Sequence, residues 1–160
     1  MNRHDLVPLV ISACLTGVPC RYDGKDNCLP KEILRRLEDR FLLIPVCPEV
    51  LGGLPTPRVP SEIQGDGRVL NREGADVSRE FRKGAELALT AAETAGASLA
   101  CLKAHSPSCG NRSVYDGTFS GVLRPGKGIA VNLFEKTGKK VYNENEIDSL
   151  IGETTHVRST

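Results

Sequence analysis

The stretch Phe41-Leu-Leu-Ile-Pro-Val-Cys-Pro-Glu49 decides the fold. Its first six residues form a continuous apolar run, which is typical of a strand buried on both faces. The run stops at Cys47, and a segment rich in glycine and proline follows from Leu51 to Pro60. A thiol, a rigid proline and a carboxylate therefore come together where a buried strand is expected to reach the surface.

Two further apolar runs repeat this arrangement. Residues 7–13 lead into Cys14, and residues 98–102 lead into a loop that contains Cys109. Between the first two runs, apolar residues recur at helical spacing from Pro30 to Arg40. A strand, a helix and a second strand in this order predict a parallel pair joined by a right-handed crossover. We therefore expect an α/β fold, a single Rossmann-like domain with a mostly parallel sheet and a small hairpin insertion.

The remaining elements follow from local patterns of apolar, turn and capping residues. In chain order they are a hairpin over 62–70, a helix over 77–94 with Asp76 as N-cap, a long loop over 103–125 with at most one turn at 115–118, a helix over 129–136, a strand over 140–142 and a helix over 144–151. The domain is expected to span residues 1–152, and residues 153–160 are expected to form a flexible C-terminal tail.

Composition and charge exclude several classes of protein. The chain has 160 residues, and its 21 basic and 20 acidic residues leave a net charge of +1, which does not suit a protein that binds a polyanion. No apolar stretch approaches the roughly 20 residues that span a bilayer. The N-terminus lacks the pattern of a signal peptide. We therefore expect a cytoplasmic protein without a membrane partner, whose six cysteines are not paired in disulfides.

The three cysteines that follow strands are candidates for a metal centre. The carboxyl ends of parallel strands meet at one edge of a sheet, so Cys14, Cys47 and Cys109 are expected to converge there. Converging thiolates suggest a soft metal or an iron–sulfur cluster, and three ligands rather than four leave one position open for a substrate. The alternative is that each cysteine is a small buried apolar residue. That alternative fits Cys101 best and also fits Cys28, whereas Cys20 remains ambiguous.

Several polar residues accompany these cysteines. Glu49 is a candidate general acid or base, the alternative being an exposed loop glutamate. Ser106 and Ser108 are candidate hydrogen-bond donors to a substrate, or plain turn residues. Lys103 and Arg58, and also Arg21, are candidates to meet a phosphate group if the substrate is a nucleotide.

Five segments resemble a known family. They are Ile11-Ser-Ala-Cys-Leu-Thr-Gly17, Cys20-Arg-Tyr-Asp-Gly24, Pro45-Val-Cys-Pro-Glu-Val-Leu-Gly-Gly-Leu-Pro-Thr-Pro-Arg58, Leu102-Lys-Ala-His-Ser-Pro-Ser-Cys-Gly110 and Tyr115-Asp-Gly-Thr-Phe119. Together they resemble the DUF523 family, which includes thiouracil desulfurases, and the resemblance covers about residues 7–145.

The resemblance implies a Rossmann-like domain that holds a [4Fe-4S] cluster on Cys14, Cys47 and Cys109, with one iron open. It also implies a non-redox hydrolysis in which the open iron takes the sulfur of a thiocarbonyl group and water supplies the oxygen. By motif, the catalytic carboxylate falls on Glu49 and the catalytic serine on Ser106, with Ser108 the second choice. Larger relatives carry an additional C-terminal domain associated with thiolated tRNA, which favours a free thiouracil or a thiouridine nucleotide as the substrate here.

Two other functions compete with a desulfidase. One is a non-catalytic protein that carries or senses an iron–sulfur cluster or zinc, which would have no need of Glu49. The other is a thiol redox protein, which the lack of a C-x-x-C pair disfavours. The sequence leaves the oligomeric state open.

Overall fold

The computed structural model describes residues 5–157 and is built around a four-stranded parallel sheet with the order β2-β1-β5-β8. The strands are β1 (Val7–Ser12), β2 (Phe41–Val46), β5 (Leu99–Cys101) and β8 (Lys140–Tyr142). This confirms the predicted fold class. The three apolar runs that lead toward cysteines are adjacent strands and point in the same direction.

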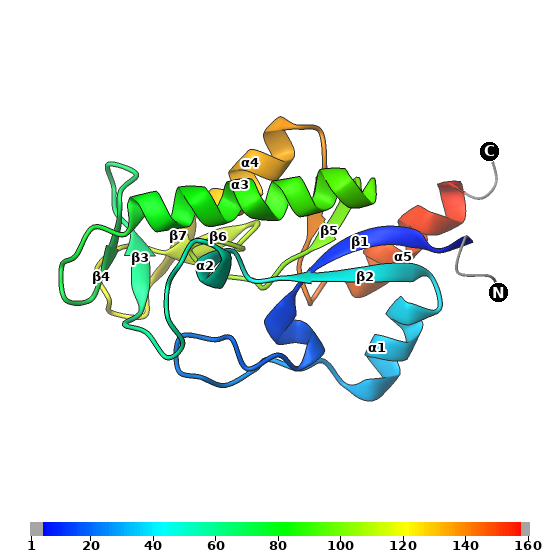
Figure 1. The fold of residues 1–160 in the computed structure, drawn as a ribbon, viewed down its shortest axis with the longest axis horizontal. Coiled ribbons are helices and arrows are strands. Elements are labelled where there is room, and N and C mark those ends of the chain that lie inside the picture. The colour runs from blue at the N-terminus through cyan, green and yellow to red at the C-terminus, as the bar shows by residue number, and fades with distance from the viewer. Residues whose placement is uncertain (1–4, 158–160) are drawn as a thin grey trace.

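Helices cover both faces of this sheet, as Figure 1 shows. They are α1 (Lys31–Glu38), α3 (Ser78–Ala95), α4 (Ile129–Lys136) and α5 (Ile147–Val157). Leu9 and Ile11 of β1 pack in one apolar cluster with residues of α1 and α5. Val10, between them, packs in a second cluster with residues of α3 and α4. Since successive side chains of a strand point to opposite faces, both faces of β1 are buried and the run is apolar throughout.

The long helix α3 agrees with its predicted extent except at its start. Its N-cap is Val77 rather than Asp76. Asp76 still serves the first turn, because its Oδ1 accepts the N–H of Ser78 at 2.9 Å. The helix ends as expected at Gly96, whose φ of 70° suits a residue without a β-carbon.

Two hairpins, rather than the single predicted one, stand beyond the C-terminal ends of the parallel strands (Figure 1). The first, β3 (Ser61–Ile63) with β4 (Val69–Asn71), confirms the prediction. The second, β6 (Ser113–Tyr115) with β7 (Leu123–Pro125), lies in the segment predicted to be a loop, so that prediction is wrong there. Its strands have three residues each, which is too short for a readable alternation of apolar and polar residues.

The extent predicted for the C-terminal helix, 144–151, is also wrong, because α5 begins at Ile147 and continues to Val157, into the segment expected to be a tail. Thr154 is fully buried, and its hydroxyl donates to the carbonyl of Ile151 at 2.6 Å. Glu153 accepts hydrogen bonds from Lys140 and from the Tyr142 hydroxyl. Glu153 therefore attaches this part of α5 to β8. The rest of the expected tail, residues 158–160, lies outside the described part of the chain. Within residues 5–157, no helix has the length and apolar character needed to cross a membrane.

A carboxylate at the start of α5 makes the stability of the fold dependent on pH. Glu146 accepts hydrogen bonds from Asn111, from Arg112 and from the backbone N–H of Asn143. The Arg112 guanidinium is the main cause that lowers the pKa of the Glu146 carboxyl. Because the folded-state pKa lies below the unfolded value of about 4.3, this carboxylate stabilises the fold at neutral pH and loses that effect as the pH falls through the folded-state pKa.

We therefore expect Glu146→Gln to lower the free energy of unfolding by about 1–2 kcal/mol near neutral pH. The difference between parent and variant should vanish in acid, where the parent carboxyl is also protonated. Urea unfolding at a series of pH values measures both quantities. A difference that stays constant over the whole series would contradict the assignment.

Candidate active site

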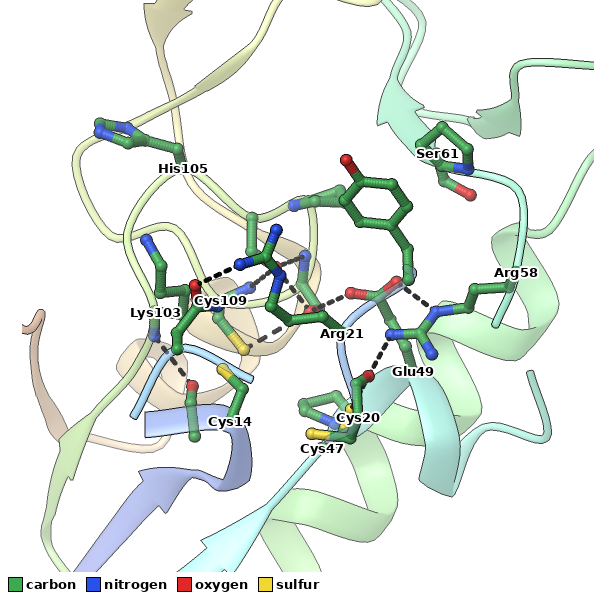
Figure 2. Close-up of a pocket in the computed structure, with 18 of the residues that line it drawn as sticks. Cys14, Cys20, Arg21, Cys47, Glu49, Arg58, Ser61, Lys103, His105 and Cys109 are labelled. Atoms are coloured by element: carbon green, nitrogen blue, oxygen red, sulfur yellow. Dashed lines mark hydrogen bonds and ion pairs between the residues drawn. The ribbon is translucent and has the colours of Figure 1, made fainter. Parts of the chain in front are cut away.

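The three strand-end cysteines line a single cavity of about 470 Å³ at the C-terminal edge of the sheet. Cys14 lies in the 3₁₀ turn η2 (Ala13–Thr16) directly after β1. Cys47 is the N-cap of the short helix α2 (Pro48–Leu51) directly after β2. Cys109 lies in the loop that follows β5. Figure 2 shows their side chains turned toward a common space.

The three thiols are close enough to influence one another's protonation. Burial is the largest cause that raises the pKa of Cys14, and negative charge on Cys47 raises it further. Burial raises the pKa of Cys109 to about 12, with smaller contributions from Glu49 and Cys14 in the same direction. Hydrogen bonds from Ser108 and Ser12 act in the opposite direction on Cys109. Burial destabilises the thiolate forms of these cysteines. A positively charged metal group that replaces the thiol protons would compensate the thiolate charge and so stabilise these forms.

The arrangement of the three cysteines suits an iron–sulfur cluster better than a single metal ion. Among the described residues, no three His, Cys, Asp or Glu side chains are arranged to hold one metal ion. A four-iron cluster is larger than an ion, so its thiolate ligands stand farther apart around it. Three cysteines with free sulfurs that line one cavity are the soft donor set that such a cluster takes. The residues therefore fit the cluster.

The other three cysteines differ in their surroundings. Cys101 is fully buried in the apolar cluster beneath β1, which agrees with a structural role, and Cys28 is exposed. Cys20 lines the cavity, and its carbonyl lies 3.9 Å from the Cys47 sulfur. Burial and then the neighbouring thiols raise its pKa to about 12. Cys20 is thus a fourth sulfur at the site, a position that sequence reasoning left ambiguous.

Glu49 is fixed in the cavity rather than exposed on a loop. Its Oε1 lies 3.2 Å from Arg58 Nε, and its Oε2 accepts a hydrogen bond from Ser108 Oγ at 3.1 Å. The Glu49 side chain is only 15% exposed and that of Arg58 only 6%. The alternative of an exposed glutamate is therefore wrong, and the carboxylate is held from both sides.

The backbone that carries Glu49, helix α2, packs closely against helix α3. Helix α2 crosses α3 at two glycines, Gly52 and Gly84. A β-carbon on Gly84 would lie 1.7 Å from the carbonyl oxygen of Pro48, and one on Gly52 would lie 1.9 Å from that of Glu80. Only glycine allows this approach, so α3 determines where Cys47 and Glu49 stand relative to the sheet.

The two serines form a chain of hydrogen bonds that ends on Glu49. Ser106 Oγ accepts the backbone N–H groups of Ser108 and Cys109, both at 3.2 Å, and lies 2.9 Å from Ser108 Oγ. Because Ser106 Oγ already accepts two N–H groups, its proton is free to point at Ser108. The single proton of Ser108 can in turn be donated to Glu49 Oε2, at 3.1 Å, or to Cys109 Sγ, at 3.4 Å. Ser108 thus contacts the carboxylate directly, and Ser106 reaches it through Ser108.

The arginine and lysine side chains predicted to meet a phosphate group form hydrogen bonds and ion pairs within the protein. Arg58 donates to Glu49, to Thr56 Oγ1 and to the carbonyls of Pro55 and Cys20. Lys103 lines the cavity and lies 3.4 Å from Glu144. Arg58 is therefore a partner of the carboxylate in this structure. Lys103 and Arg21 are more accessible, each with its side chain 30% exposed, and Arg21 also lines the cavity and pairs with Asp23 at 2.9 Å.

Sequence reasoning missed one side of the cavity. Tyr22, Glu62, Arg72 and Phe119 also line it, mostly from the two hairpins and the loop after β1. The motif Tyr115-Asp-Gly-Thr-Phe119 was a signal that pointed to this region, but it assigned no role to the phenylalanine. Nothing in the local pattern distinguished Glu62 from an ordinary exposed strand residue.

The fold and the site define a Rossmann-like α/β protein with a sulfur-lined cavity and a fixed carboxylate at the carboxyl ends of its parallel strands. The chain belongs to the 2-thiouracil desulfurase family, whose model matches residues 9–146. It is 36% identical over 152 residues to the uncharacterized protein YbbK of Bacillus subtilis (strain 168), across 89% of this chain and 99% of that protein. A solved structure, the [4Fe-4S]-dependent thiouracil desulfidase TudS (DUF523Vcz), is 41% identical with a TM-score of 0.87, across 93% of this chain and 98% of that one. These findings confirm the resemblance to DUF523 proteins.

Proposed function

We propose that this protein is a [4Fe-4S]-dependent desulfidase that removes sulfur from a small thiolated pyrimidine by hydrolysis without net redox change. One observation carries the proposal. Cys14, Cys47 and Cys109 line the same cavity as Glu49, and Glu49 is fixed there by Arg58 and Ser108. The likeness to a thiouracil desulfidase over nearly the whole chain supports the same activity.

In this proposal Cys14, Cys47 and Cys109 hold the cluster, and all the described residues form one cluster-binding domain. When bound, the cluster would supply an iron without a protein ligand, a Lewis acid that accepts the soft sulfur of the substrate. The reaction replaces C=S by C=O. One water is consumed, its oxygen stays on the carbon, and its two protons leave with the sulfur as hydrogen sulfide.

The protein's own contribution is proton transfer and orientation. Glu49 takes a proton from the attacking water, and Arg58 orients the carboxylate for this task through its contact with Oε1. Ser106 is the proposed catalytic serine, because Ser108 is nearly fully buried and already bonded to Glu49. Protons can pass between Ser106 and Glu49 through the Ser108 hydroxyl. The Ser106 hydroxyl would orient the ring or its departing sulfur.

The proposed substrate is thiouracil or a thiouridine nucleotide. A cavity of about 470 Å³ is of the size that encloses a small ligand. The Arg58 side chain is only 6% exposed, whereas that of Lys103 is 30% exposed and lines the cavity, so Lys103 is the cation we propose for a phosphate group. The balanced charge of the chain favours a free base or nucleotide over tRNA. We place the protein in the cytoplasm, where free thiols stay reduced.

The test is a single-substrate assay on anaerobically reconstituted protein in water enriched in heavy oxygen. We expect about four iron and four sulfide per chain, and we expect 2-thiouracil to yield uracil that carries one heavy oxygen, with one equivalent of sulfide and no added reductant. Full cluster content without turnover would favour a carrier or sensor instead. Bound zinc in place of iron would exclude the cluster mechanism.

A further inference from the structure

Backbone strain within residues 5–157 is concentrated at the cavity. The positive-φ residues other than glycine there are His105, at 70°, and Phe119, at 56°, and both line the cavity. This conformation is unfavourable for a residue other than glycine, because its β-carbon comes too close to the backbone. The cost persists only where surrounding contacts impose it. Phe119 lies at the tip of the β6–β7 hairpin, a segment that we define as residues 116–122.

A buried carboxylate imposes the conformation of this tip. Glu62 on β3 is only 8% exposed, and its Oε1 accepts the backbone N–H of Gly117 at 3.0 Å and that of Phe119 at 3.1 Å. Gln64 Nε2 donates to the carbonyl of Gly117 at 3.2 Å. A β-carbon on Gly117 would lie 2.9 Å from the carbonyl oxygen of Ile63. The tip is therefore bound tightly to the other hairpin, through groups 53 to 57 residues apart in sequence.

The Phe119 ring differs in chemistry from most of the cavity wall. The groups on the sheet side are thiols, hydroxyls, a carboxylate and cations. Phe119 adds a flat apolar surface, and the Arg72 guanidinium carbon lies 5.9 Å from its ring centroid. This cation–π contact further restricts the ring. A flat heterocycle that enters the cavity needs such a surface, because stacking on an aromatic ring binds a nucleobase without using its polar edges.

We infer that Phe119 is the residue on which the pyrimidine ring of the substrate packs, and that Glu62 is a positioning residue that holds Phe119 in place. This inference rests on the proposed function, since it takes the substrate to be a thiolated pyrimidine. It assigns the edge of the ring to Glu49 and the serines, and the face of the ring to the β6–β7 hairpin. Neither Phe119 nor Glu62 takes part in the bond changes.

The test compares KM and kcat for 2-thiouracil in reconstituted Phe119→Ala, Phe119→Tyr and Glu62→Ala. Phe119→Ala should raise KM about 5-fold to 150-fold, since stacking on one aromatic ring is worth about 1–3 kcal/mol and 1.4 kcal/mol is a factor of ten, and should leave kcat within about twofold. Phe119→Tyr retains an aromatic ring at this position and should have a KM close to that of the parent. Calorimetric titration with uracil should show the same loss in affinity, independently of turnover.

A double-mutant cycle isolates the role of Glu62. Glu62→Ala alone should raise KM, but it should add little once Phe119 is already alanine, because the carboxylate acts through that side chain. Glu146→Gln, which removes a carboxylate outside the cavity, controls for a general loss of stability. Additive effects of the two substitutions would overturn the positioning role, and an unchanged KM in Phe119→Ala would overturn the packing role.

These outcomes separate the inference from the function on which it rests. A parent protein that releases sulfide while Phe119→Ala keeps its KM contradicts the inference alone. A parent protein with full cluster and no sulfide release contradicts the proposed function. In that case the uracil titration still decides the inference: a parent that binds uracil and loses it in Phe119→Ala supports the packing role, and any other result overturns it.

Discussion

Glu49→Gln should abolish sulfide release while leaving the iron content of the reconstituted protein unchanged. The substitution keeps the size and shape of the side chain, and the amide oxygen can still accept a hydrogen bond from Arg58 or Ser108. It removes the group that takes a proton from water. General acid–base catalysis contributes about 10²–10⁴ to rates, so we expect turnover of 2-thiouracil to fall at least about a hundredfold.

The measurement is sulfide release per iron, so that incomplete reconstitution does not imitate loss of catalysis. Glu146→Gln is the matched control, because that carboxylate also pairs with an arginine but lies outside the cavity. It should retain parent activity. Loss of both iron and activity in Glu49→Gln would show that Glu49 supports the cluster rather than the chemistry. Unchanged activity would remove Glu49 from the mechanism.

Cys47→Ser should lose the cluster, and Cys14→Ser and Cys109→Ser should behave in the same way. A serine hydroxyl is a hard, weakly acidic donor that does not replace a thiolate on iron. We expect iron and acid-labile sulfide to fall from about four each to a small fraction, and sulfide release to disappear with them. Iron analysis and the visible absorption of the reconstituted protein report the loss without reference to activity.

Two control variants show whether this loss is specific. Cys28→Ser changes an exposed thiol, and Cys101→Ala changes one buried in the core. Both should keep the cluster, although Cys101→Ala should lower the stability of the fold because it leaves a small cavity. Equal loss of iron in all five variants would indicate general destabilisation. Retention of iron in Cys47→Ser would indicate that Cys20, which lines the same cavity beside Cys47, is a cluster ligand in its place.

Much of the fold can be predicted from local patterns of apolar and polar residues along the sequence. The apolar runs over 7–13, 41–46 and 98–102 predict buried parallel strands, and the structure confirms the parallel pairing of all three. Burial holds for β1 and β5, whereas β2 is an edge strand on which Leu42 is exposed. The second hairpin could not be predicted in the same way. Its strands have three residues each, and Val114 is their one fully buried side chain. The extension of α5 beyond residue 151 was missed because it depends on the contacts of Glu153 with Lys140 and Tyr142 of β8, which no local helical pattern signals.

The candidate site likewise has some features that the local sequence predicts and others that only the tertiary structure shows. The sequence alone predicted that Cys14 and Cys47 lie at the carboxyl edge of the sheet, since each comes within two residues of the end of a parallel strand, and that the loop after the third strand brings Cys109 to the same edge. Only the tertiary structure decided that Glu49 pairs with Arg58 and meets Ser108, which lies 59 residues away, and that Glu62 holds Phe119 across 57 residues. The reason is physical. Hydrophobic periodicity and strand ends are properties of neighbouring residues, whereas the contact between two polar side chains depends on how α2, the loops and both hairpins pack.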